Sequence, residues 1–276
     1  MFAVPRTYDG LPSFHDEEVT GTPMRLKRML AEDSDSLRER SGAKITILEH
    51  GGKHPVLINR GQRHSRSFFP SAKVNTVQFV EGLAEERVAK YYEIHGPSID
   101  YQCHQLMIQF MLNRRLRKYI SDLSRAFVDA KGVVVPELIE VKRFPGDLRD
   151  DDYKEKLAAV RELLRSIGWR FTIINDREMF SPPELLPNVE RIFVRRYAGL
   201  DEKECSAAEE IIKAGAPVTW GEFRRAVAPT DPLQGDAVIE TLIARGKLLT
   251  DLEQYLCNST FLQPSIRRSA ASPIRI

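Results

Sequence analysis

The segment from residue 133 to residue 176 constrains the fold of this 276-residue chain more than any other. Residues 133–144 (VVVPELIEVKRF) are rich in β-branched residues, which predicts a strand. Residues 150–168 follow with an apolar helical stripe that acidic residues lead and Gly168 ends. The strand pattern of residues 169–176 comes directly after it. A strand, a helix and a strand at this spacing form a βαβ crossover, so we expect the two strands to lie parallel in one sheet.

The residues before this crossover extend the pattern. Helical periodicity covers residues 77–95, and strand patterns cover residues 98–112 and 117–130. The complete order is therefore α-β-β-β-α-β over residues 77–176. This order predicts an α/β fold in which one sheet carries helices on its faces.

The chain changes character after the prolines at 182, 183 and 187. Most of the remainder shows helical patterns, and Thr219 with Glu222 forms a capping box at the start of one helix. A helix over residues 236–245 comes next, and two short strands joined by a tight turn end the pattern. Helices followed by a β-ribbon predict a winged-helix-like domain.

The expected organisation has three parts. Residues 1–45 contain scattered prolines and glycines, which predicts an N-terminal arm that only a partner would order. Residues 46–180 form the α/β domain and begin with a small hairpin over residues 45–60. Residues 181–276 form the mainly helical domain.

Composition limits the class of protein. Hydrophobic residues make up 42% of the chain, and 41 Lys and Arg balance 39 Asp and Glu, so the chain as a whole is not disordered. No apolar run approaches the roughly 18 residues of a membrane span, and the N-terminus lacks a signal-peptide pattern. The three cysteines, Cys103, Cys205 and Cys257, are far apart, which favours a reducing cytosol over a disulfide framework or a zinc site.

Two strands carry charged residues that call for an explanation. Glu140 and Lys142 lie on one face of the apolar strand 133–144 because side chains two apart in a strand point the same way. Asp122 lies in the preceding strand, and folding the hairpin near residue 131 sets it opposite Glu140. Facing carboxylates repel unless one is protonated or a cation lies between them, and Mg²⁺ prefers such oxygen ligands. Pro136 lies in the second of these strands and indicates a β-bulge, which would shift this register.

Further polar residues precede these strands. Glu81 and Glu85 are expected on one face of the helix 77–95, with Glu86 beside them. Gln105 is a polar residue in an apolar strand. Taken singly, the acidic residues are typical of a solvated helix face, and Gln105 is typical of a hydrogen-bonded sheet residue. Their order along the α-β-β-β-α-β pattern is what indicates a joint site.

That order matches the PD-(D/E)xK nuclease pattern, and the core resembles the restriction-endonuclease-like fold. Residues from about 60 to 197 are similar to the TnsA family, the endonuclease subunit of heteromeric (TnsABC-type) transposases. The winged-helix-like C-terminal part agrees with that family's second domain. The matching pieces are SAK with VEGLAEE, YQCHQ, YISDL, ELIEVKRF and GWRFTIINDREM.

The resemblance implies a residue set. Glu85 matches the helix acid, with Glu86 as the alternative, Asp122 matches the Asp of the motif, and Glu140 with Lys142 match its E-x-K element. One departure is that Ser121, not proline, precedes Asp122.

The residue types suggest the chemistry of this set. Asp122, Glu140 and the Val141 carbonyl would bind Mg²⁺, with Mn²⁺ as an expected substitute, and Glu85 would complete a second metal site or orient a water molecule. Lys142 would lie beside that water or beside the developing phosphorane charge. We therefore expect hydrolysis of a phosphodiester without a covalent intermediate.

The resemblance also implies the biological context. It implies a DNA endonuclease that cuts the 5′ strand ends of a transposon during cut-and-paste transposition. The implied partners are double-stranded DNA at the transposon ends, a DDE-type transposase subunit and an AAA+ ATPase regulator, in the cytoplasm at the nucleoid. Two alternatives stay open: a non-catalytic winged-helix DNA-binding or adaptor protein with a decayed nuclease core, and a stand-alone restriction or junction-resolving nuclease.

Local basic groups are consistent with a DNA substrate although the net charge is only +2. Other basic groups, among them Arg191, Arg195 and Arg196, recur elsewhere in the chain. The acidic residues Asp236 and Glu240 of the helix 236–245 argue against deep insertion of that helix into a DNA groove. The basic residues expected to contact DNA are Arg63, Arg66, Arg114, Arg115, Lys118 and Arg143.

Overall fold

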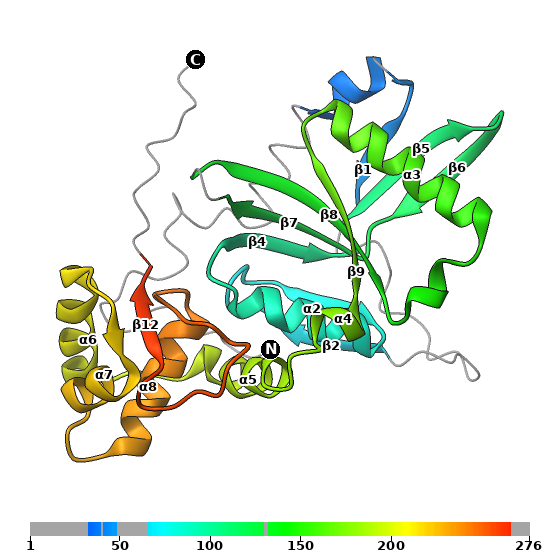
Figure 1. The fold of residues 1–276 in the computed structure, drawn as a ribbon. Coiled ribbons are helices and arrows are strands. Elements are labelled where there is room, and N and C mark those ends of the chain that lie inside the picture. Colours follow the sequence, from blue (N-terminus) through cyan, green and yellow to red (C-terminus); the bar gives the residue numbers. More distant parts are fainter. Residues whose placement is uncertain (1–32, 40, 49–65, 130–131, 266–276) are drawn as a thin grey trace, which may run out of the picture.

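The computed structural model describes residues 33–39, 41–48, 66–129 and 132–265, and it is a mixed α/β structure (Figure 1). The strands are β1 (Lys44–Ile47), β2 (Arg66–Pro70), β3 (Val77–Glu81), β4 (Ser98–Cys103), β5 (Leu106–Leu112), β6 (Arg115–Ile120), β7 (Leu123–Val128), β8 (Val134–Lys142), β9 (Arg170–Asn175), β10 (Val218–Thr219), β11 (Leu248–Leu249) and β12 (Phe261–Pro264). The helices are α2 (Leu83–Ile94), α3 (Asp151–Ser166), α4 (Asp176–Met179), α5 (Leu185–Phe193), α6 (Glu202–Ala214), α7 (Trp220–Val227) and α8 (Pro232–Ala244), with 3-10 turns at η2 (Pro145–Leu148) and η3 (Val194–Tyr197).

The central sheet has the strand order β4-β7-β8-β9. β7 is antiparallel to both β4 and β8, and β9 is parallel to β8, which confirms the βαβ crossover through α3. The expected register of the β7–β8 hairpin is also confirmed, because Leu123 pairs with Ile139 and Val128 pairs with Val134. Pro136 pairs with Ala126 without a register shift, so the expected bulge is absent from this hairpin.

The two long strands expected before β8 are each divided into two. Residues 98–112 form β4 and β5, and residues 117–130 contribute to β6 and β7. β5 and β6 leave the central sheet and pair with β1 in a second sheet of order β1-β5-β6. The prediction of single strands was wrong because nothing local to the chain marks where a strand changes sheets.

Part of the expected N-terminal arm belongs to the folded structure. β1 pairs with β5, and the side chains of Leu37 and Ala43 are fully buried. The indole nitrogen of Trp169 donates a hydrogen bond to Asp33 Oδ2 at 2.7 Å. The arm prediction is therefore wrong for residues 33–39 and 41–45, whereas residues 1–32, residue 40 and most of the hairpin expected at residues 45–60 lie outside the described residues.

The helix predicted to begin at Val77 begins at Leu83. Val77–Glu81 is the strand β3, which pairs with β2. Gly82 follows with φ 116°, a backbone angle that favours glycine and separates the strand from α2. Glu81 and Glu85 therefore do not share a helix face, which corrects that prediction.

Two hydrophobic clusters cover the two faces of the central sheet. α3 packs on one face through Leu157, Val160 and Leu164, together with buried residues of β1, β5 and β6. Asp150 caps this helix by accepting hydrogen bonds from the second and third residues of its first turn. α2 packs on the other face, where its cluster continues into α5, α7 and α8. The sheet is thus buried on both sides, which holds the ends of its strands in place.

The C-terminal part has the order α6-β10-α7-α8-β11-β12, with a small sheet of order β10-β12-β11. The capping box of Thr219 and Glu222 at the start of α7 is confirmed. The tight turn expected between the last two strands is wrong, because residues 250–260 separate β11 from β12. The three helices and the small sheet lie at the opposite end of the molecule from the β5–β6 hairpin (Figure 1).

One apolar core links the C-terminal helices to the helix α2. The rings of Phe69 and Phe193 meet edge to face with their centroids 5.2 Å apart, and Lys90 on α2 pairs with Glu190 on α5 at 3.0 Å. The hydrophobic cluster is continuous across residue 180, where the two domains were expected to divide. Among the described residues, none of the helices combines the length and the apolar character that a membrane crossing requires.

Candidate functional site

The candidate site lies where two strand pairs bend out of the central sheet together. The backbone N–H of His104 donates to the carbonyl of Asp122 at 3.0 Å, and that of Ser121 donates to the carbonyl of Leu106 at 3.0 Å. His104 adopts a φ of 49°, a left-handed conformation that is uncommon for residues other than glycine. The bend releases Asp122 from the β ladder, so its side chain is free to turn toward β8.

Asp122 contacts β8 between Glu140 and Lys142. Its Oδ2 accepts a hydrogen bond from the backbone N–H of Val141 at 2.7 Å. Burial, followed by the charges of Glu140 and Glu85, raises the pKa of Asp122 well above its usual range, although Lys142 and the Val141 N–H oppose the shift. Three carboxylates therefore lie close enough to affect one another, as the hairpin register predicts for Asp122 and Glu140.

Glu140 is 3% exposed and is held by groups from three elements. Tyr119 on β6 donates its hydroxyl to Glu140 Oε2 at 2.9 Å, and Tyr153 on α3 and Lys142 both bond to Oε1. Burial opposes the charge of Lys142, but the carboxylates of Glu140 and Asp122 outweigh it and raise the pKa of this amine above its ordinary value. Lys142 is therefore a stable cation beside the carboxylates.

Glu85 approaches the site from the first turn of α2. Its Oε2 accepts the backbone N–H of Glu81 at 2.8 Å and lies 3.0 Å from His104 Nε2. Glu86 instead accepts from Ser67 and pairs with Lys90. Because the charge of Glu85 raises the pKa of Asp122, Glu85 rather than Glu86 is the helix acid on the side of the site.

The site has the donor chemistry of a divalent-cation site but not a complete ligand set. Among the described residues, no group of three or more acidic, His or Cys side chains is arranged to hold a metal ion as it stands. In this arrangement both oxygens of Glu140 accept hydrogen bonds, from two tyrosines and from Lys142. Asp122, Glu140 and Glu85 nevertheless supply three carboxylates against one ammonium, an excess of negative charge that a hard cation would neutralise.

The sequence pattern missed three of the residues that surround these carboxylates. Tyr119 and Tyr153 hold Glu140, and His104 holds Glu85. Buried tyrosine hydroxyls need polar partners, but nothing in the sequence marks Tyr119, in the basic strand β6, or Tyr153, in α3, as buried beside a carboxylate. His104 carried no signal either, because it was assigned to a strand. Cys103 beside it is inert as a nucleophile, because burial and then the charges of Glu85 and Asp122 raise the pKa of its thiol.

Gln105 is hydrogen-bonded as its ordinary interpretation predicts, but it lies between β4 and β5 and not within a strand. Its side chain is 2% exposed, and its Oε1 accepts a hydrogen bond from the Ser124 hydroxyl at 3.0 Å. Its carbonyl accepts the backbone N–H of Leu48 at 2.7 Å. Gln105 therefore supports the bend of the strands and contacts none of the carboxylates described above.

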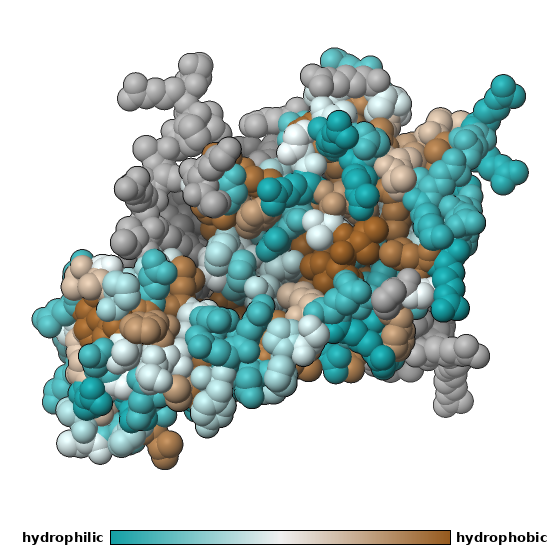
Figure 2. Space-filling model, in the orientation of Figure 1, coloured by the Kyte–Doolittle hydropathy of each residue, from teal (hydrophilic) through white to brown (hydrophobic). Residues whose placement is uncertain are grey.

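The basic residues expected at DNA fall into different environments. Arg66 pairs with Glu81 at 3.2 Å. Arg143 is exposed, and its guanidinium lies 5.2 Å from the ring centre of Phe144. Arg114, Arg115 and Lys118 are exposed at the end of the β5–β6 hairpin, where hydrophilic residues gather in Figure 2. Arg63 lies outside the described residues.

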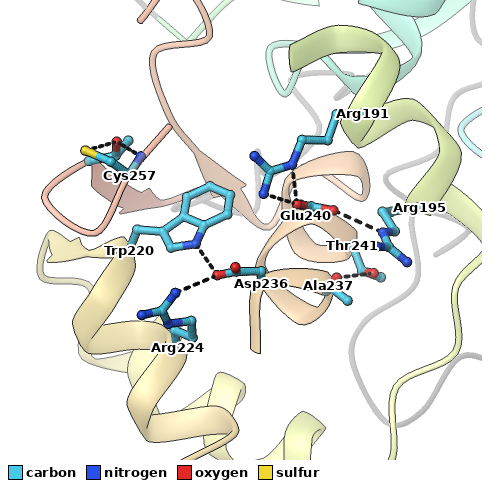
Figure 3. A network of polar contacts seen from close by, with 10 residues as sticks. Arg191, Arg195, Trp220, Arg224, Asp236, Ala237, Glu240, Thr241 and Cys257 are labelled. Atoms are coloured by element: carbon cyan, nitrogen blue, oxygen red, sulfur yellow. Dashed lines mark hydrogen bonds and ion pairs between the residues drawn. The ribbon is translucent and has the colours of Figure 1, made fainter. Parts of the chain in front are cut away.

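Two arginines of another basic group have a structural role instead. Arg191 and Arg195 both donate to the carboxylate of Glu240, at 2.6 Å and 3.0 Å (Figure 3). Asp236 on the same helix accepts from the indole of Trp220 at 2.7 Å. α8 is buried from residue 238 to residue 244, whereas its first residues, 232–234, are exposed, so the part expected to read DNA is enclosed.

Comparison with known proteins leaves the family open. No family model matches the chain, and no curated protein matches it. Among solved structures, the protein VC1899 from Vibrio cholerae aligns with 43% of this chain at 18% identity and a TM-score of 0.25. The match spans 34% of the length of VC1899, so the chain covers about a third of that protein.

Proposed function

We propose that this chain is a Mg²⁺-dependent DNA endonuclease subunit of a transposase, with a restriction-endonuclease-like core followed by a winged-helix-like domain. One observation carries the proposal: the carboxylate of Asp122 is hydrogen-bonded to the backbone N–H between Glu140 and Lys142. An aspartate thus meets an E-x-K element from the neighbouring strand, with Glu85 near enough to raise the pKa of that aspartate. The α2-β4-β7-β8-α3-β9 order supports the same nuclease pattern.

The residues of the site have distinct roles in hydrolysis. Asp122, Glu140 and the carbonyl of Val141 would hold Mg²⁺, which supplies Lewis acidity at the scissile phosphate. Lys142, a cation held by its carboxylate neighbours, stabilises negative charge that develops on the phosphate oxygens. Glu85 orients the attacking water, and His104 holds the Glu85 side chain. Tyr119 and Tyr153 keep Glu140 in place until a cation competes for its oxygens.

The proposed context is the cutting of 5′ strand ends at a transposon. In that setting the chain acts on double-stranded DNA beside a DDE-type transposase subunit and an AAA+ ATPase, in the cytoplasm at the nucleoid. The buried α8 supports a protein-docking role for the C-terminal part, because the helix expected to read DNA is enclosed by its own domain and α5.

Cleavage assays with Mg²⁺ and the partner proteins test the proposal. Lys142→Ala is expected to lower the single-turnover rate of nicking by about 10²–10³-fold, and Asp122→Asn by at least as much. Asp129→Asn is the matched control, because Asp129 is an aspartate at the far end of the same β7–β8 hairpin.

The outcomes separate the alternatives. Undiminished cleavage by Asp122→Asn would refute the assignment of the site. DNA binding without cleavage by the wild type, unaffected by Glu140→Gln, would indicate the non-catalytic adaptor. Sequence-specific cleavage by the purified chain alone would indicate a stand-alone nuclease.

A further inference from the structure

The β5–β6 hairpin extends from the candidate site as a two-stranded ribbon. Its pairing with β1 ends where Lys44 meets Gln109, so beyond Gln109 the ribbon has two strands within the described ranges. β6 has six residues between the turn and the bend at Asp122, which corresponds to roughly 20 Å. The tip of the hairpin is therefore a fixed distance away from the carboxylates along a continuous strand.

The turn of this hairpin is built at a conformational cost. Leu112 pairs with Arg115, which leaves a two-residue turn of Asn113 and Arg114 with φ angles of 49° and 60°. Two left-handed residues of this kind form a type I′ turn, in which glycine is strongly preferred at the second position. Arg114 takes that position instead. A strained backbone at an exposed arginine is consistent with a role for its side chain in binding.

The two faces of the ribbon differ. One face is fastened to α3, because Asn113 donates to both oxygens of Glu155 and Arg117 pairs with Asp152. The other face carries Met111 and Leu116, which are cross-strand partners and are each 62% exposed. The ribbon is thus held rigidly with an apolar pair facing solvent.

Positive charge lies near this apolar pair: Lys118 is on the same face of β6 as Leu116, Arg114 is in the turn, and Arg115 is on the opposite face. Arg114, Arg115 and Lys118 are exposed, and none of them forms an ion pair within the described part of the chain. The nearby carboxylates of Asp152 and Glu155 are engaged by Arg117 and Asn113. Three cations without counter-charges complement a phosphate backbone rather than an acidic side chain of this protein.

We propose that the end of this hairpin lies in the major groove of duplex DNA, with Met111 and Leu116 toward the base edges and Arg114, Arg115 and Lys118 on the phosphates. The deduction rests on the proposed function, since it assumes that the candidate site faces DNA. The widths of the major and minor grooves of DNA determine which of them can hold the hairpin. A two-stranded ribbon fits the major groove of about 12 Å and exceeds the minor groove of about 6 Å. At 3.4 Å per base pair, the tip contacts DNA about six base pairs from the scissile phosphate.

Binding of the full-length chain to a mixed-sequence duplex tests the proposal, with a chelator present so that the DNA stays intact. The triple variant Arg114→Ala, Arg115→Ala, Lys118→Ala is expected to bind at least about ten-fold more weakly and to lose about two to three units of salt dependence. The double variant Met111→Ser, Leu116→Ser is expected to bind several-fold more weakly with an unchanged salt dependence, because it removes no charge. A control triple variant, Arg165→Ala, Lys203→Ala, Lys213→Ala, removes three exposed cations from other surfaces and should bind within about two-fold of the wild type.

A second measurement does not depend on the folding of variants. Oxidation of Met111 in the wild-type chain by hydroxyl radicals should slow when the duplex is added. An unchanged oxidation rate, or a triple variant with the wild-type salt dependence, would overturn the proposal, and so would a wild type that binds no duplex.

The outcomes also distinguish this proposal from the nuclease assignment. If the hairpin variants lose DNA binding but the wild type does not cleave with Mg²⁺, the hairpin proposal stands and the nuclease assignment fails. If cleavage depends on Asp122 while the hairpin variants bind DNA normally, only the hairpin proposal fails. A third outcome is that the hairpin variants bind DNA normally but lose the cleavage that the wild type shows when the partner proteins are present. That outcome would identify the hairpin as a contact for a partner protein and would overturn its assignment to the groove.

Discussion

Glu140 and Glu240 are buried to the same degree but in opposite electrostatic surroundings. Each is 3% exposed. Glu240 accepts from two guanidinium groups, those of Arg191 and Arg195 (Figure 3). Glu140 lies beside another carboxylate, that of Asp122, and the two share one ammonium, that of Lys142.

The difference separates a carboxylate whose charge is balanced by its neighbours from one whose charge is not. The charge of Glu240 is balanced by its two arginine partners, so this buried group helps to fix one packed arrangement of α5 and α8. A buried group with excess like charge destabilises the fold and persists where a ligand or a reaction uses it. The excess of like charge at the bend in the sheet is what the proposed function would use, whereas the charges at α5 and α8 are balanced within the fold.

The largest stability effect is expected at the balanced carboxylate. Glu240→Ala should lower the free energy of unfolding by about 3 kcal/mol, because two charge-assisted hydrogen bonds to a buried carboxylate are lost. Urea unfolding measures this change. Glu209→Ala breaks the exposed pair with Lys213 and should cost less than about 1 kcal/mol. If Glu240→Ala and Glu209→Ala cost the same, the buried carboxylate of Glu240 would contribute no more than an exposed ion pair, and its contrast with Glu140 would lose its basis.

A buried base beside cations extends the comparison to the opposite charge. Burial, then the charges of Lys73 and Arg125, lower the pKa of His95 from 6.5 to about 3. The folded state therefore binds fewer protons than the unfolded state between these values, so stability is lost as the pH falls below about 6.5. The loss should reach about 2 kcal/mol at pH 5, since each pKa unit corresponds to about 1.4 kcal/mol.

The variant His95→Gln isolates this contribution. Its free energy of unfolding should change less between pH 7 and pH 5 than that of the wild type. Equal pH dependence of the two proteins over this window would show that His95 is not the responsible group.

The smallest stability effect is expected at the unbalanced carboxylate, and it has the opposite sign. The pKa of Asp122 is raised, so the folded state binds the proton more tightly, and stability is lost as the pH rises through that raised pKa. Asp122→Asn removes the charge and should increase the free energy of unfolding at neutral pH by on the order of 1 kcal/mol. Addition of Mg²⁺ should raise the melting temperature of the wild type but not that of Asp122→Asn. Destabilisation by Asp122→Asn that equals that of Glu240→Ala would remove the distinction between the two carboxylates.

Much of the candidate site could be predicted from the residues alone. The register of the β7–β8 hairpin placed Asp122 near Glu140, and the two-residue period of a strand placed Lys142 on the same face. The partners of these carboxylates could not be predicted in this way. Tyr119 and Tyr153 reach Glu140 from β6 and α3, and their positions depend on how two sheets and a helix pack.

The sequence by itself determined the parts of this protein that depend on neighbouring residues. These parts are the helix α3 with its cap, the parallel β8–β9 pair and the hairpin that brings Asp122 to β8, because periodicity, capping and short turns act over a few residues. Only the tertiary structure decided where the chain leaves β4 for the second sheet and where it returns to β7. It also decided that β1 joins the second sheet and that the C-terminal strands pair across residues 250–260. Those pairings are made between segments far apart in the chain, and the hydrophobic contacts that select them exist only when the whole molecule has packed.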